Sequence, residues 1–194
     1  PISYKVITIS HKNIEDKRKN KFIKSNKVRF TFLASTKPYK GFYMLKEVMD
    51  ELYSEKKDGF ELNVYSSFIS NKKEKYINLY KDGFKQEELE NIFLKTDVLI
   101  APSLWYETFG FTVLEALSYG VPVIVSENVG SKDIVKDAGI VVKANDKNEL
   151  RKAIEICTKE KIQELRNNAL GKIQIKAFYE FVDEIKKIYV RSLK

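Results

Sequence analysis

Two carboxylates eight positions apart, Glu107 and Glu115, are the side chains best suited to chemistry in this sequence. The turn between them, TFGFT, contains one glycine and precedes apolar residues at helical spacing. A helix start presents unpaired backbone N–H groups and the positive end of the helix dipole, and both favour a bound phosphate. Carboxylates on either side can accept hydrogen bonds from hydroxyl groups. The segment therefore indicates a site for a nucleotide sugar, whose phosphates lie between two groups rich in hydroxyls.

Length and composition indicate a single globular domain. The chain has 194 residues, 43% of them apolar, which is enough to bury a sizeable core. It has no apolar run of about 18 residues, so we expect no transmembrane helix, and its first residues show no signal peptide. The single cysteine, Cys157, lies in a helical pattern and allows no internal disulfide. We expect it to be a core residue of a reduced, cytoplasmic protein.

The net charge of +8 leaves three kinds of partner open: nucleic acid, an anionic membrane surface or a phosphorylated ligand. Much of the excess lies in residues 11–27, which lack apolar periodicity, and we favour a solvated linker over a functional patch there. Lysine outnumbers arginine, and arginine does not cluster with aromatic residues, which argues against nucleic acid. Peripheral association with a membrane surface stays open.

Apolar runs of strand length alternate with helical patterns along the chain. Strands are expected at 28–34, 60–68, 76–84, 97–103, 122–127 and 139–144. Helices are expected near 41–56, 86–96 and 111–120, in a short piece at 131–137, and in three segments beyond residue 146. This alternation predicts an α/β fold, a Rossmann-like parallel sheet flanked by helices. Ligands bind such sheets beyond the carboxyl ends of the strands, where the loop 100–110 is expected.

The segment from Glu107 to Val123 resembles the donor-site motif of retaining GT-B glycosyltransferases, the group 1 family also called family four. The motif reads E-x-F-G-x-x-x-x-E-A-x-x-x-G-x-P-V. Its fixed positions are matched here by Glu107, Phe109, Gly110, Glu115, Ala116, Gly120, Pro122 and Val123. The competing interpretation is a solvated loop followed by an ordinary helix that carries a glutamate by chance.

The loop after the first expected strand is similar to a second motif of this family. There the strand leads into G-R-x-x-x-x-K-G, whose lysine contacts the diphosphate of the donor. Lys40 and Gly41 match the last pair, but Ala34 and Ser35 stand where the family has glycine and arginine. Lys37 lies close enough in sequence to supply a positive charge, but it lacks the planar fork of arginine.

Two later segments extend the resemblance, which covers residues 28–160 in all. Gly83 and Phe84 match the family's loop that holds the nucleobase through backbone groups, although a core position for Phe84 is an equal alternative. Gly130 and Asp133 match a glycine and an acidic residue that shape the edge of the sheet.

The resemblance implies a role for each matched residue. Glu115 would accept hydrogen bonds from the ribose, Lys40 would neutralise the leaving diphosphate, and the catalytic Glu107 would contact the transferred sugar. The donor-binding residues would be Lys40, Gly41, Gly83, Phe84, Thr108, Phe109, Gly110, Phe111, Thr112 and Glu115, with the backbone N–H groups of 109–111 facing the phosphates. No metal or other cofactor is expected, because members of this family usually need no bound metal and the sequence has one histidine, one cysteine and no metal-ligand spacing. The nucleoside-diphosphate sugar would be the substrate.

Three other residues are less clearly assigned by the sequence. His11 is the single histidine, and we expect it to be structural or exposed to solvent, because the family's catalytic histidine belongs to another domain. Trp105 and Tyr106 precede Glu107, and they either stack on a sugar or base or pack the loop.

The resemblance also implies an incomplete enzyme. Residues 1–27 would be the tail of the linker that joins this half to a missing N-terminal acceptor domain, and residues 28–194 the donor-binding Rossmann-like domain with its C-terminal helices. The acceptor would be a saccharide or a lipid-linked group, in the cytoplasm or at the inner face of the membrane. Two alternatives remain: a non-catalytic nucleotide-binding module of the same fold, and a basic domain that binds nucleic acid or anionic lipid.

Overall fold

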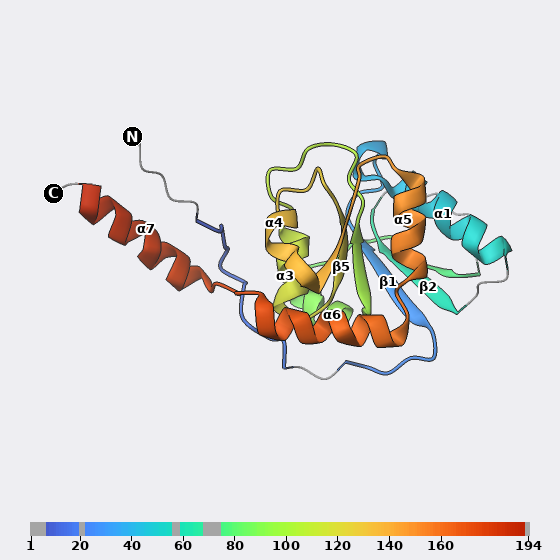
Figure 1. The fold of residues 1–194 in the computed structure, drawn as a ribbon, viewed down its shortest axis with the longest axis horizontal. Coiled ribbons are helices and arrows are strands. Elements are labelled where there is room, and N and C mark those ends of the chain that lie inside the picture. The colour runs from blue at the N-terminus through green and yellow to red at the C-terminus, as the bar shows by residue number, and fades with distance from the viewer. Residues whose placement is uncertain (1–6, 20–21, 56–58, 68–74, 193–194) are drawn as a thin grey trace.

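A six-stranded parallel sheet forms the centre of the molecule in the computed structural model, which describes residues 7–19, 22–55, 59–67 and 75–192 (Figure 1). The strands run in the order β3-β2-β1-β4-β5-β6. Their bounds are β1 Val28–Leu33, β2 Phe60–Tyr65, β3 Ile77–Tyr80, β4 Val98–Ala101, β5 Val123–Ser126 and β6 Gly139–Val142. The predicted Rossmann-like sheet is therefore confirmed.

Seven α-helices and three short 3-10 turns lie in the described part of the chain. The helices are α1 Phe42–Ser54, α2 Leu89–Leu94, α3 Phe111–Ser118, α4 Lys132–Val135, α5 Lys147–Glu155, α6 Lys159–Lys172 and α7 Phe178–Ser192. The turns are η1 Pro38–Lys40, η2 Gln86–Glu88 and η3 Lys136–Ala138.

Several predicted elements are longer than the observed ones. The strand expected at 76–84 ends at Tyr80, and the helix expected at 86–96 divides into η2 and α2. The strand expected at 60–68 ends at Tyr65, and its last predicted position, 68, lies outside the described residues, as does the end of the helix predicted at 41–56. Patterns of apolar residues locate an element better than they locate its ends.

Helices cover both faces of the sheet, and each face has its own core. Helices α1 and α5 pack on one face, where Leu45, Val48 and Leu150 are fully buried. Helices α2 and α3 pack on the other, around Phe93 and Leu117. Helix α6 crosses beneath the strands in Figure 1 and contributes to both cores. Burial on both faces explains why the strands read as continuous apolar runs.

The strand order reverses between β1 and β4, which are neighbours in the sheet although two strands separate them in sequence. The chain leaves β1 toward α1 on one face and leaves β4 toward α3 on the other. Loops that diverge in this way leave a crevice beyond the carboxyl ends of the two strands, where ligands bind in folds of this type.

Residues 7–19, which we call the amino-terminal strap, pack against the domain. Ile14 is 2% exposed, the Lys17 N–H donates to the Ser118 carbonyl at 2.8 Å, and Arg18 Nη1 donates to the Ala169 carbonyl at 2.6 Å. The solvated linker predicted at 11–27 is therefore wrong for Ile14, Lys17 and Arg18, whereas Lys12, Asn13, Glu15 and Asp16 are exposed. Residues 1–6 and 20–21 of the predicted linker lie outside the described residues, and the domain boundary at residue 28 stays a prediction.

Helix α7 projects away from the rest of the domain (Figure 1). Tyr179 and Tyr189 on this helix are each 69% exposed, so it does not dock on its own sheet. Within the described ranges, no helix is long and apolar enough to cross a membrane.

Candidate functional site

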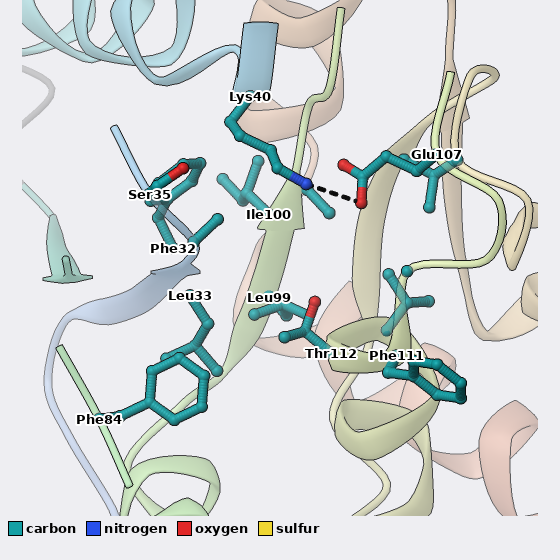
Figure 2. A pocket seen from close by; sticks show the side chains of 15 residues that line it. Phe32, Leu33, Ser35, Lys40, Phe84, Leu99, Ile100, Glu107, Phe111 and Thr112 are labelled. Atoms are coloured by element: carbon teal, nitrogen blue, oxygen red, sulfur yellow. Dashed lines mark ion pairs between the residues drawn. The ribbon is translucent and has the colours of Figure 1, made fainter. Parts of the chain in front are cut away.

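A cavity of about 300 Å³ lies at the point where the strand order reverses (Figure 2). Its walls come from the end of β1 (32–35), the end of β4 (99–101) and the start of α3 (110–113). Its volume is at the lower end of the range for small-molecule sites. Six of the predicted site residues line it: Lys40, Phe84, Glu107, Gly110, Phe111 and Thr112. Residues from distant parts of the sequence thus meet in the expected crevice.

An ion pair between Lys40 and Glu107 spans the cavity in Figure 2, with Nζ 2.9 Å from Oε2. Lys40 ends the turn η1, and its side chain is 26% exposed, whereas that of Glu107 is 22% exposed. Both groups are therefore reachable by a ligand. In this state each charge neutralises the other, so an anionic ligand at Lys40 must take the place of the Glu107 carboxylate.

Hydrogen bonds to the loop after β5 hold the backbone of Glu107. Its N–H donates to the Asn128 carbonyl at 2.9 Å, and its carbonyl accepts from the Gly130 N–H at 3.0 Å. A Cβ at Gly130 would lie 2.2 Å from the Thr108 carbonyl oxygen. Gly130 is therefore required for the two loops to approach each other, which is how this matched position acts on the site.

Helix α3 begins beside this pair. Gly110 precedes its first residue with φ 84°, a left-handed conformation that favours glycine, and a Cβ there would lie 2.6 Å from the Val129 side chain. The backbone N–H groups of Phe111 and Thr112, the first two residues of α3, have no acceptor among the described residues. Because both residues line the cavity, the anion-binding end of the helix faces it. Phe111 is one of the donors predicted at 109–111, and the role of the N–H groups of Phe109 and Gly110 stays a prediction.

Five predicted residues do not line this cavity: Gly41, Gly83, Thr108, Phe109 and Glu115. Gly41 has φ 76°, and a Cβ there would lie 1.9 Å from the Pro102 carbonyl oxygen, so it is needed for close packing of two loops. Gly83 lines a separate cavity near the end of β3. Thr108 and Phe109 line an adjoining groove, which also includes Lys40, Glu107, Gly110 and Phe111.

The same groove exposes two aromatic side chains. Trp105 is 70% exposed and Tyr106 is 80% exposed. Such exposure contradicts the interpretation that they pack the loop. Their rings are available to a ligand or partner at the edge of the site.

The charge that the family's arginine would supply is absent from the described cavity lining. Ala34 and Ser35 lie in the wall, and Lys40 is the single cation among the described lining residues. Lys37 does not line the cavity, and its Nζ lies over the Tyr39 ring, 5.8 Å from the centroid. The prediction that Lys37 lies close enough to replace the arginine is not supported by this geometry.

Glu115 lies one turn further along α3, outside the lining of the main cavity. It is 7% exposed, and its Oε1 accepts a hydrogen bond from Gln86 Nε2 at 3.3 Å. Burial raises the pKa of the Glu115 carboxyl, and the Gln86 hydrogen bond opposes this effect. Helix α3 places Glu115 next to the residues that line the cavity, and burial shields its carboxylate from bulk water.

His11 faces the same carboxylate, which the sequence did not predict. Its Nε2 lies 3.3 Å from Glu115 Oε1, its side chain is 24% exposed, and its ring meets that of Phe111 edge-on at 5.0 Å. Burial lowers the pKa of the imidazole. Of the two expected positions, structural or exposed to solvent, the partly buried side chain fits the structural one. Ile14, an isolated apolar residue in a charged segment, was the one signal that this segment packs on the domain.

The described residues contain no group of three or more His, Cys, Asp or Glu side chains able to hold a metal ion. Cys157 is buried on α5's side of the sheet, as predicted, and burial raises the pKa of its thiol to about 12. This cysteine is consequently a core residue with an unreactive thiol.

Comparison with known proteins bears directly on this site. The family described as "Glycosyl transferases group 1" matches residues 13–172. The chain is 30% identical over 139 residues to an uncharacterised 41.2 kDa protein in the cps region of Klebsiella pneumoniae, covering 69% of this chain and 37% of that protein. It is 33% identical over 110 residues to an Escherichia coli UDP-Gal:alpha-D-GlcNAc-diphosphoundecaprenol alpha-1,3-galactosyltransferase, covering 54% of this chain and 28% of that enzyme.

Solved structures share the fold. A sucrose-phosphate synthase from Thermosynechococcus elongatus superposes with a TM-score of 0.73 at 18% identity, covering 88% of this chain and 47% of that one. Anabaena HepE in complex with UDP superposes with a TM-score of 0.72 at 16% identity, covering 86% and 49%. The chain thus spans half or less of the length of these relatives. The match over most of the chain, together with the parallel sheet and its crevice, shows that the chain belongs to the group 1 glycosyl transferases, a family of enzymes with the GT-B fold.

Proposed function

We propose that this chain is the donor-binding half of a retaining glycosyltransferase, which moves a sugar from a nucleoside-diphosphate sugar to a saccharide or lipid-linked acceptor. The observation that carries the proposal is the convergence of Lys40, Glu107 and the free N–H groups of α3 on one crevice. A relative named for UDP-Gal and a structural neighbour in complex with UDP support a donor of this class.

The diphosphate is proposed to lie between Lys40 and the start of α3. There the N–H groups of Phe111 and Thr112 donate to its oxygens, and Lys40 compensates the charge that develops on the leaving group. Because the phosphate displaces the Glu107 carboxylate from Lys40, Glu107 becomes free to contact the transferred sugar. Lys40 supplies the positive charge in this scheme, so we propose that no metal is needed.

The nucleoside is proposed to extend from the diphosphate toward Glu115 and Phe84. The Glu115 carboxylate accepts hydrogen bonds from the ribose hydroxyls. The Phe84 ring, which lines the cavity in Figure 2, lies beside the base, and the backbone near Gly83 holds its edge. Thr108, Phe109 and Gly110 carry the loop that joins the sugar and phosphate regions.

The acceptor is proposed to bind between this domain and a second domain outside these 194 residues. The chain spans half or less of its relatives, and Trp105 and Tyr106 expose their rings beside Glu107, where an acceptor sugar could stack. The proposed location is the cytoplasm, at the inner face of the membrane when the acceptor is lipid-linked. One domain provides only one wall of this cleft and cannot align the donor with an acceptor, so these residues alone are expected to bind the donor without efficient transfer of its sugar.

Thermal-shift and calorimetric titrations with UDP-, GDP-, dTDP- and ADP-sugars test the proposal. One donor is expected to raise the melting temperature, and Lys40→Ala should weaken its diphosphate much more than its nucleoside. Lys152→Ala on the exposed face of α5 is the matched control, because it removes the same charge far from the cavity. Failure of every nucleotide to bind, or an equal loss of nucleoside and diphosphate in Lys40→Ala, would contradict the proposal.

A second candidate function is a non-catalytic nucleotide-binding module. The observation that favours it is Ala34 and Ser35 in the cavity wall, where the family carries an arginine for the diphosphate. Donor binding by a two-domain protein without hydrolysis or transfer would identify this function. Binding of DNA or anionic liposomes that weakens steeply with salt would instead indicate a basic surface-binding domain.

A further inference from the structure

We propose that His11 is a positioning residue of the donor site: its Nε2–H holds one oxygen of Glu115 so that the other can bind the ribose. This inference rests on the proposed function. It assigns a role to the amino-terminal strap, whose composition otherwise indicates a solvated segment.

The strap holds His11 in one place. Ile14 is buried, and its N–H donates to the His11 carbonyl at 3.0 Å. Lys17, three residues further on, is bonded through its N–H to the Ser118 carbonyl at the end of α3, the helix that carries Glu115. The imidazole is thus attached to the same helix as the carboxylate that it faces.

A backbone hydrogen bond selects the tautomer of the ring. The Asn13 N–H donates to His11 Nδ1 at 3.3 Å, so Nδ1 must be the acceptor and the neutral imidazole carries its proton on Nε2. Nε2 is the atom that lies 3.3 Å from Glu115 Oε1. The ring therefore presents an N–H group to the carboxylate without needing to be charged.

This N–H group has no other acceptor among the described residues. Nε2 is buried and makes no hydrogen bond of good geometry among the described residues, because its approach to Glu115 is out of line. An unpaired buried donor is unfavourable, so a small rotation that aligns it with Oε1 is favourable. The edge-on Phe111 ring limits other movements of the imidazole.

Both donors near Glu115 act on the same oxygen. Gln86 Nε2 donates to Oε1, and His11 Nε2 lies at the same distance, 3.3 Å, from that atom. Oε2 has no hydrogen-bond partner among the residues that the structure describes. Once the His11 N–H is aligned with Oε1, the two side chains orient the carboxylate and leave Oε2 as the acceptor for a ribose hydroxyl. Fixing a ligand-binding group in this way lowers the cost of ordering it on binding.

The test compares UDP, ADP and GDP with their 2′,3′-dideoxy analogues in calorimetric titrations. His11→Ala should weaken the best-binding ribonucleotide by about three- to tenfold, the effect of losing one hydrogen bond, and leave its dideoxy analogue nearly unchanged. His11→Gln retains an N–H donor and should restore much of the preference for ribose. Asn13→Ala keeps its backbone N–H and serves as the control.

A spectroscopic measurement complements the titrations, because His11 is the single histidine and its imidazole nitrogens are unambiguous in a ¹⁵N spectrum. The free chain should show the Nε2–H tautomer, and the ribonucleotide should shift the Nε2 signal more than the dideoxy analogue does. An equal loss for both nucleotides in His11→Ala would show a purely structural role. Unchanged binding in His11→Ala, or the Nδ1–H tautomer, would also overturn the proposal. If no nucleotide binds the parent chain, the proposed function fails and this role fails with it.

Discussion

Replacing Glu107 with glutamine is expected to strengthen binding of a nucleoside diphosphate to this chain, although Glu107 belongs to the site. The carboxylate lies 2.9 Å from Lys40 Nζ, and both side chains are about a quarter exposed, at 22% and 26%. Ion pairs at such accessible positions contribute up to about 1 kcal/mol. The diphosphate must break this pair to reach Lys40, whereas glutamine competes with it weakly and carries no negative charge. Removing about 1 kcal/mol of competition corresponds to about fivefold tighter binding.

The assay is calorimetric titration of the parent and variant with UDP and with uridine at low and high salt. Glu107→Gln should tighten UDP binding, most clearly at low salt, and leave uridine binding unchanged. Glu164→Gln is the matched control, because it removes the same charge and breaks a 2.7 Å ion pair with Lys161 on α6, near the amino ends of β1 and β4 and therefore at the other end of the strands from the cavity. Weaker UDP binding by Glu107→Gln, or the same gain in the control, would refute the competition between Glu107 and the phosphates.

Three further outcomes are expected. Glu115→Gln should weaken UDP binding by about 1–3 kcal/mol, the range for hydrogen bonds to charged groups; titration of the variant beside the parent measures this, and unchanged affinity would remove Glu115 from the ribose site. The same variant should melt at a higher temperature than the parent at pH 7. Burial raises the pKa of Glu115 above its ordinary value of 4.5. The contribution of protonated Glu115 to the folding free energy is therefore fully present below that pH and is lost as the pH rises through the folded-state pKa. The difference in melting temperature between variant and parent should vanish in acid, and a difference independent of pH would contradict the burial argument. Ser35→Arg should raise the affinity for UDP but not for uridine, because it restores a bidentate phosphate donor in the cavity wall, and a loss of UDP affinity would show that the wall has no room for the side chain.

Local sequence patterns located the sheet and most of the site. The spacing of Glu107 and Glu115 around a glycine turn predicted a helix start for phosphate, and α3 does begin there, at Phe111. Apolar runs of strand length predicted the parallel sheet, because strands that are buried on both faces need no polar alternation. Those patterns left the ends of elements uncertain, since pairing with neighbouring strands decides where a ladder stops. The extent of β3 illustrates this, because its ladder with β2 ends at Tyr80 rather than at the predicted residue 84.

Local patterns do not show the contacts of residues whose neighbours are distant in sequence. Lys37 is three positions from Lys40, yet it lies over Tyr39 outside the cavity lining. Gly41 was assigned to the donor site because it matches a motif, and the structure shows that the close approach of Pro102 leaves no room for a larger residue at this position. The spacing along a loop does not reveal which way its side chains turn.

The sequence by itself determined the fold class and the place where α3 begins, and it indicated Lys40, Glu107 and Glu115 as candidate residues, because apolar runs, a glycine turn and short motifs are all local features of the chain. Tertiary structure alone decided that Lys40 pairs with Glu107 at 2.9 Å, and that His11 faces Glu115 across 104 positions of sequence. A charged segment whose few apolar residues show no periodicity does not predict burial. Ile14 becomes buried because the folded domain offers its side chain an apolar surface, and that surface exists only once the sheet and helices have assembled.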